Sequence, residues 1–299
     1  MFWNNLAVAT NYFVEIAVEL TVLFIGITFL VGLIQEYVSD ETIKKALGGR
    51  HRFIGSILGA GFGALTPFCS CSTIPLLLGM LNAGVPFAAA MAFLFSSPLL
   101  NPVIISLFVI LLGWKVAALY FAVTFVCAII ISLLLDWLGF ASQVKSAAVI
   151  RGGCDCQQAT DARSRVQRSA RFAFNLFRQL MPYLLIGAGI GAFIHGFVPT
   201  EIVSRLAGPS NPLAVPVAAI VGIPLYIRAE TMIPIGLALI EKGMSVGAVL
   251  ALIIGGAGAS IPELALLSAI FKKRLLAAFV ATVFAIAVAA GYLANLLAL

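Results

Sequence analysis

Residues 66–75 read Thr-Pro-Phe-Cys-Ser-Cys-Ser-Thr-Ile-Pro, and residues 223–234 read Ile-Pro-Leu-Tyr-Ile-Arg-Ala-Glu-Thr-Met-Ile-Pro. Each stretch interrupts apolar sequence with prolines and polar side chains. The two stretches also occupy corresponding places in the two halves of the chain. Five landmark pairs, 67/224, 75/234, 84/243, 102/262 and 115/274, are separated by 157, 159, 159, 160 and 159 residues. So steady an offset indicates an internal repeat.

The composition is that of a membrane protein. Hydrophobic residues make up 62% of the 299 residues and charged residues 10%, and the mean hydropathy is +1.11, which excludes an ordinary soluble domain. The N-terminus lacks the basic segment and small-residue cleavage site of a signal peptide. Basic residues are scattered between apolar runs, so we expect the lipid bilayer as a partner and no nucleic acid. Runs long enough to cross about 30 Å of hydrocarbon lie at 13–34, 86–112, 116–137, 172–194, 246–271 and 275–298.

The positions of lysine and arginine predict the orientation. Of the 18 basic residues, fourteen lie in 44–52, 145–178 and 272–274, whereas Lys115, Arg205 and Lys242 stand alone. Cytoplasmic loops carry an excess of basic residues, so we expect the three clusters inside and the three single residues outside. Repeat-related positions then lie on opposite faces of the membrane. Each repeat therefore crosses an odd number of times, and the two repeats have inverted topology.

The predicted fold class is an all-α polytopic membrane protein with two inverted-topology repeats. Each repeat holds full-length spans plus a broken or re-entrant helix pair. We expect the first repeat over 1–139, a cytoplasmic linker over 140–171 and the second repeat over 172–299. The predicted location is the bacterial inner (plasma) membrane with both termini outside; a homo-oligomer is left open. The predicted helices are 13–36, the pair 53–67 and 73–82, 86–112 and 116–137, then 172–194, the pair within 213–240, 246–271 and 275–298, with amphipathic pieces at 39–47 and 199–207.

The first bend, around 68–72, carries the sharpest local chemistry. Pro67 and Pro75 remove backbone donors and discourage a continuous helix, and irregular backbone at membrane depth is tolerated where it is buried in protein or lines a cavity. The half-helix that follows would favour an anion at its N-terminus, whereas two thiols would favour a soft ligand or metal. Small residues are also common in plain helix packing. The substrate-binding candidates here are Cys69, Ser70, Cys71, Ser72 and Thr73.

The second bend carries charges in place of thiols. Arg228 and Glu230 lie in apolar sequence, where ionisable residues are costly and face a partner or a cavity. One interpretation is an ion pair that locks the bend. The other makes Arg228 an anion receptor and Glu230 a proton carrier. Tyr226 is expected to line the same cavity.

A further pair of interruptions matches Ser96-Ser97-Pro98 and Asn101-Pro102 with residues 255–263. Asn101 is a substrate-binding candidate, and Glu263 is a second proton-coupling candidate or the cap of a half-helix. Ser96, Ser97 and Ser260 either line the cavity or pack helices together.

The linker contains Cys154-Asp155-Cys156, a weak signal for capture of a thiophilic metal at Cys154 and Cys156. Cys69 and Cys71 are equally weak metal candidates. No cofactor motif occurs, and we expect none.

Four motifs in order resemble the bacterial predicted permease family, which includes YraQ-like and ArsP-like permeases. The resemblance spans nearly the whole chain apart from the linker. It implies efflux of trivalent organoarsenicals across the inner membrane, with Cys69 and Cys71 contacting the arsenic. The motifs that carry it are Thr66–Pro75, Phe93–Pro102, Gly222–Glu230 and Gly256–Ser260.

The leading hypothesis is a secondary transporter rather than an enzyme. Duplicated hydrophobic halves with matching broken helices are typical of such transporters, whose site lies between the repeats near the bilayer midplane. We expect a proton-coupled exporter of a small soft or anionic solute. The alternatives are an intramembrane thiol oxidoreductase that uses Cys69 and Cys71, and a passive channel.

Overall fold

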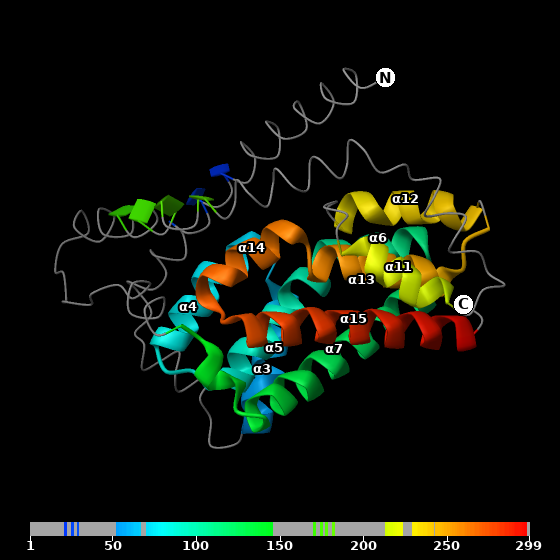
Figure 1. Ribbon diagram of the computed structural model, residues 1–299. Helices are drawn as coiled ribbons and strands as arrows, with labels where there is room; N and C mark the ends of the chain where they lie inside the picture. Colours follow the sequence, from blue (N-terminus) through cyan, green and yellow to red (C-terminus); the bar gives the residue numbers. More distant parts are fainter. Residues whose placement is uncertain are drawn as a thin grey trace.

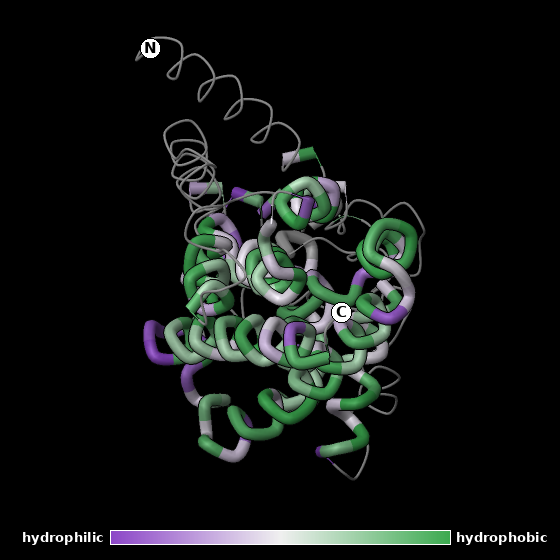
Figure 2. The backbone as a smooth tube through the Cα atoms, turned by 90° about the vertical axis from the view of Figure 1, so that its right-hand side faces the viewer, coloured by the Kyte–Doolittle hydropathy of each residue, from purple (hydrophilic) through white to green (hydrophobic). Residues whose placement is uncertain are grey.

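The computed structural model describes residues 52–66, 70–145, 213–223, 229–241 and 243–297, together with scattered helical positions between 21 and 29 and between 170 and 182. Within these residues the chain is all-helical, with a single isolated bridge and no strand. Figure 2 shows that most of the described helices are hydrophobic along their length. The predicted helices 13–36 and 172–194, both amphipathic pieces and most of the linker lie largely outside the described residues.

The helices of the two halves correspond one to one (Figure 1). The bounds of four consecutive helices recur at a constant distance, 70/229, 82/241, 87/246, 99/258, 102/261, 111/270, 114/273 and 137/296, which is 159 residues in every case. The period predicted from landmark residues is therefore also the period of the helix bounds. The first half contains α3 (Arg52–Leu65), α4 (Ser70–Asn82), α5 (Phe87–Leu99), α6 (Pro102–Leu111) and α7 (Trp114–Trp137), followed by the short 3-10 helix η1 (Phe140–Gln143). The second half contains α11 (Ala214–Gly222), α12 (Ala229–Glu241), α13 (Val246–Gly258), α14 (Ile261–Ile270) and α15 (Lys273–Leu296).

Up to four membrane spans lie within the described part of the chain. Helices α7 and α15 are each long and apolar enough to cross a membrane alone. The pairs α5–α6 and α13–α14 each pass the same test together, and each is bent by 41° at its break. Helices α3, α4 and α12 are shorter apolar helices. The interruptions predicted within 86–112 and 246–271 are thus breaks between two half-helices.

Two predicted details of these breaks are wrong. The first bend was expected to extend through Ser72, but α4 begins at Ser70, so Ser70–Thr73 form its first turn. Pro75 and Pro98 were expected to break their segments, yet both lie inside helices. A proline removes only one donor, and membrane helices tolerate it where neighbouring groups pair with the freed carbonyl. The break occurs instead at Asn101, where the following Pro102 favours an extended residue before it, and Asn101 has φ −48° and ψ 132°.

Close helix contacts also recur between the halves. Gly63 of α3 lies against α5, where an added Cβ would meet the Phe93 carbonyl oxygen and the Ser97 amide nitrogen, each at 3.0 Å. Gly222 of α11 lies against α13 in the same way, facing the Leu252 carbonyl and the Gly256 amide. The three pairs of equivalent positions, 63/222, 93/252 and 97/256, are again each 159 residues apart. Small residues at such crossings let two helices approach closely in a membrane.

Helices α7 and α15 hold the two halves against each other and run in opposite directions. The end of α7 continues through η1 to Val144, which forms an antiparallel bridge with Phe271, immediately before α15. The amide of Lys145 donates to the Ile270 carbonyl at 2.8 Å, and the amide of Lys272 donates to the Gln143 carbonyl at 2.9 Å. The C-terminal end of α7 therefore lies at the start of α15, and the two helices pack on each other.

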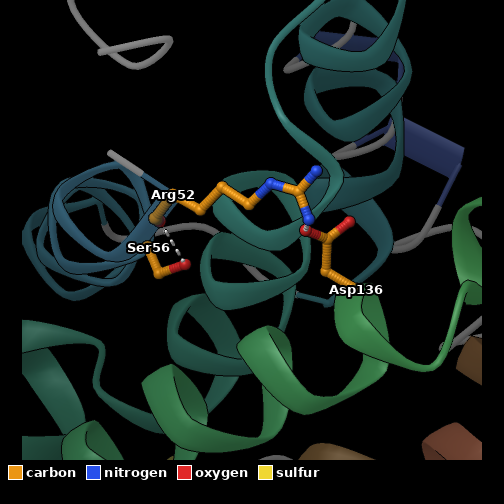
Figure 3. A network of polar contacts seen from close by, with 3 residues as sticks. All are labelled: Arg52, Ser56 and Asp136. Atoms are coloured by element: carbon orange, nitrogen blue, oxygen red, sulfur yellow. Dashed lines mark hydrogen bonds and ion pairs between the residues drawn. The ribbon is translucent and has the colours of Figure 1, made fainter. Parts of the chain in front are cut away.

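Three basic residues gather at this end, whereas Lys115 lies at the opposite end of α7. The Lys145 Nζ donates to the Ser268 carbonyl at 2.7 Å, and the Lys272 Nζ donates to the Ser142 carbonyl at 3.1 Å. Figure 3 shows Arg52 of α3 pointing to Asp136 near the end of α7, with 3.0 Å between Nη1 and Oδ2. Members of all three predicted cytoplasmic clusters thus meet at one end of the molecule.

The bridge predicts a specific disulfide. Its two flanking hydrogen bonds make Val144 and Phe271 a non-hydrogen-bonded pair, whose Cα atoms typically lie about 4.5 Å apart, within the range of a disulfide. In a chain whose native cysteines are replaced by serine, we expect Val144→Cys with Phe271→Cys to cross-link on mild oxidation, as measured by mass spectrometry. Val144→Cys with Leu276→Cys is the control. Equal cross-linking of the two pairs would contradict the bridge.

Candidate functional site

The two broken spans meet at their breaks. Gly258 is the last residue of α13, and an added Cβ there would lie 3.3 Å from Cδ2 of Leu99, the last residue of α5. These residues are equivalent by the 159-residue offset. The ends of α5 and α13, and therefore the starts of α6 and α14, come together inside the described core. This is the point at which irregular backbone from both halves converges.

Two backbone groups at the first break are paired with side chains. The Tyr120 hydroxyl, buried on α7, donates to the Leu99 carbonyl at 2.8 Å. The Asn101 side chain accepts a hydrogen bond from the Val103 amide at 2.9 Å and so caps α6. The structure thus places the predicted substrate ligand Asn101 at the N-terminus of a half-helix, 6% exposed.

The second break is less completely paired. Ser260 is 4% exposed and precedes α14, but its side chain makes no capping hydrogen bond. The residue equivalent to Tyr120 is Phe279, which has no hydroxyl and stacks on Phe95 with ring centroids 5.2 Å apart. The second break therefore lacks the side-chain hydrogen bond that the first receives from α7.

Glu263 is the most unusual group in the described core. It lies in the first turn of α14 with no solvent exposure, and neither carboxylate oxygen has a hydrogen-bond partner. The backbone of Ser260 is nearby without forming such a bond. A charged side chain at the bilayer centre costs about 3 kcal/mol on insertion scales. An unpaired, buried carboxyl is therefore costly if its role is only structural.

The predicted serines differ in their hydrogen bonding. The Ser96 hydroxyl donates to the Ala92 carbonyl at 2.6 Å, whereas the Ser97 hydroxyl is buried without a partner. Of the two, Ser97 has the free hydrogen-bonding capacity that a cavity-lining residue needs.

The remaining candidates are placed only in part. Thr73 is fully buried in the first turn of α4, and residues 70–72 belong to the same turn. Glu230 lies in the first turn of α12. The described residues contain no group of three metal-ligating side chains. Cys69, Tyr226, Arg228, Cys154 and Cys156 lie outside the described residues.

Two buried polar groups were not among the predicted site residues. Tyr120 and Thr124 are fully buried on α7, and the Thr124 hydroxyl has no partner. Their spacing of four residues, with Ala128 after the same interval, places them on one face of an apolar helix. That pattern was present in the sequence and marks the face of α7 turned to the core.

One groove lies away from these residues, between α11 and α15. Its volume is about 540 Å³, and its lining is almost wholly apolar: Ile220, Ile223, Ala277, Val280, Ala281 and Phe284. None of the predicted site residues lines it.

The apolar spans and paired breaks define a multi-pass membrane protein. Comparison with known proteins then places it more narrowly. The chain belongs to the predicted permease family ArsP_1, whose profile matches residues 5–296, which confirms the resemblance drawn from the motifs. A transporter rather than an enzyme is the class that this family indicates.

Three bacterial proteins are similar to most of this chain. The chain is 27% identical to the UPF0718 protein YcgR of Bacillus subtilis, over 88% of this chain and 89% of that protein. It is 28% identical to the UPF0718 protein YraQ of Escherichia coli, over 82% and 68% respectively. It is also 25% identical to a putative two-component membrane permease complex subunit of Streptococcus mutans, over 90% and 89%. No solved structure matches the chain.

The unpaired carboxyl predicts an unusual effect on stability. We expect Glu263→Leu to raise the thermal stability of the purified protein, because a buried group without a partner costs about 1–3 kcal/mol. Leu267→Ala, on the same buried face of α14, is the control and should lower stability by about 2–5 kcal/mol. Thermal unfolding in detergent measures both. A loss in Glu263→Leu as large as that of the control would mean that the carboxyl holds the fold together.

Proposed function

We propose that the protein is an inner-membrane secondary transporter that exports a small soft or anionic solute, such as a trivalent organoarsenical, in exchange for protons. The observation that carries this proposal is the meeting of two equivalent broken spans beside a buried, unpaired carboxyl. Broken helices with cavities at the midplane are the structural basis of binding in many transporters. Membership in a permease family agrees with this function.

The repeats are proposed to have inverted topology. Two observations support this. Helices α7 and α15 are equivalent by position, and they run in opposite directions, so they cross the membrane in opposite senses. The end of the molecule with Arg52, Lys145 and Lys272 would then face the cytoplasm, together with the linker, and both chain termini would lie outside.

This topology predicts which positions a reagent can reach. In a cysteine-free background, we expect a membrane-impermeant maleimide added to intact spheroplasts to label Lys115→Cys but not Ser142→Cys. Lys115 lies in the first turn of α7 and Ser142 just beyond its end, and both are exposed. Labelling of Ser142→Cys after permeabilisation controls for reactivity. The reverse pattern would overturn the orientation, and labelling of both positions in intact spheroplasts would overturn the placement of α7 as a span.

The proposed substrate ligands are the thiols and hydroxyls of residues 69–73, with Asn101, Arg228 and Glu230. Ser97, Ser260 and Tyr226 would complete the cavity. Thiols favour a soft solute, and an arginine would favour an anionic one. Glu263 and Glu230 are the proposed proton carriers, because a carboxyl inside a membrane protein is best tolerated when it can become neutral.

Transport by purified protein in liposomes tests the function. With a trivalent organoarsenical as the probe, we expect proton-gradient-driven flux in the wild type, and loss of flux in Cys69→Ser with Cys71→Ser. Cys127→Ser, in the middle of α7, is the matched control and should keep full flux. We expect Glu263→Gln to lose the dependence of flux on an imposed pH gradient.

Two outcomes would contradict the proposal. Flux in the wild type that ignores the pH gradient would favour a passive pore. If the variant with Cys69→Ser and Cys71→Ser still transports every thiol-binding probe, recognition of a soft solute by these thiols would be contradicted.

A further inference from the structure

Helices of each half pack on a half-helix of the other half. In each half, the helix after the first break packs on its own neighbour, α4 on α5 and α12 on α13. In addition, α4 packs on α14 of the second half, and α12 packs on α6 of the first half. Figure 1 shows α14 beside α4 and α12 beside α6. Each of these helices therefore packs on a half-helix of the opposite half, and we call the two packed pairs the α4–α14 region and the α12–α6 region.

The 159-residue offset shows how these regions differ in chemistry. Cys71 of α4 corresponds to Glu230 of α12, and Ile104 of α6 corresponds to Glu263 of α14. Cys71 therefore belongs to the helix that packs on the helix of Glu263, and Glu230 belongs to the helix that packs on the helix of Ile104. Each region holds one carboxyl residue: in the α4–α14 region it comes from α14, and in the α12–α6 region it comes from α12. Only the α4–α14 region also holds a cysteine in the first turn of its helix, Cys71 of α4.

Burial places Glu263 on the packed face of α14. The buried residues of this helix include Glu263, Leu266, Leu267 and Ile270. Spacings of three, four and seven residues put them on one side of the helix. Thr73, in the first turn of α4, is also fully buried. The carboxyl of Glu263 is thus inside the core, without a hydrogen-bond partner, on a helix that packs against the thiol-bearing helix.

We propose that Glu263 and the first turn of α4 form one site, in which a soft solute and a proton bind next to each other. Glu230 and its turn of α12 form a second, chemically separate site with α6. The proposal rests on the transport function and assigns each carboxyl to a site. Glu263, from the second half, belongs to the site of the α4 turn in the first half. A solute bound at the α4 turn then changes the protonation of Glu263 directly, and that of Glu230 much less.

Cross-linking tests the geometry without any transport measurement. The background keeps Cys71 and replaces Cys69, Cys127, Cys154 and Cys156 with serine. We expect dibromobimane, a short bifunctional thiol reagent, to join Cys71 to the cysteine of Glu263→Cys and to become fluorescent. Ile104→Cys is the matched control, because it occupies the equivalent place on α6, and it should not cross-link to Cys71. Equal cross-linking of both pairs, or of the control alone, overturns the proposal.

A second measurement keeps Glu263 in place. Dicyclohexylcarbodiimide modifies protonated carboxyls in apolar surroundings, and peptide mass spectrometry reports the modified fraction at Glu263 and at Glu230. In a chain that keeps only Cys69 and Cys71, we expect prior treatment with N-ethylmaleimide to reduce modification of Glu263 several-fold and to leave Glu230 unchanged. The effect should vanish when both cysteines are serine.

These measurements distinguish failure of the composite site from failure of the proposed transport function. Unchanged modification of Glu263, or equal loss at both carboxyls, overturns the composite site whatever the protein transports. Cross-linking and selective protection in a chain that moves no solute would support the site and contradict the transporter.

Discussion

A backbone group inside a bilayer finds no water with which to pair, and the architecture of this protein follows from that constraint. A continuous helix satisfies its own amides and carbonyls, whereas a broken helix exposes several of each at the break. Such groups are tolerated only where protein or enclosed water surrounds them. Both broken spans of the described chain obey this condition, because Leu99 and Gly258, at the two breaks, lie against each other at the centre of the helix packing.

The two breaks meet this constraint by different means. At the first, side chains supply partners: the Tyr120 hydroxyl for a carbonyl of α5, and the Asn101 amide oxygen for an amide of α6. At the second, a run of small residues, 255–260, permits close backbone approach, and the hydroxyl of Tyr120 is replaced by the ring of Phe279. The backbone geometry is duplicated, with a bend of 41° in both cases. The side-chain hydrogen bonds that pair with the backbone at the first break are not duplicated at the second. Ser260 and Glu263, which lack such partners, belong to the second break, whereas the unpaired Ser97 hydroxyl lies two residues before the end of α5 at the first.

The sequence was sufficient to predict the helices because lipid imposes strong local rules. Apolar length identified α7 and α15, and the landmark offset predicted the recurrence of helix bounds. Local rules failed where neighbours decide the outcome. Pro75 and Pro98 remain inside helices, since surrounding helices determine whether a freed carbonyl is tolerated. The hydroxyl partner of Leu99 comes from a residue 21 positions away. The packing of α4 on α14 joins segments of opposite halves, and no periodicity within one segment carries that information.

Duplication of the backbone with divergence of the side chains has a mechanistic consequence. Two halves of equal geometry can exchange their conformations at little cost in free energy, because each arrangement of one half has a counterpart in the other. Identical side chains would then make the two arrangements chemically equivalent, and a bound solute would shift nothing between them. The replacement of Cys71 by Glu230, and of Ile104 by Glu263, removes that equivalence. A ligand that contacts the α4 turn interacts differently with the two arrangements, which is the condition for any ligand to drive a conformational equilibrium. The asymmetry at the breaks is therefore the feature of the fold on which the proposed coupled transport would rest.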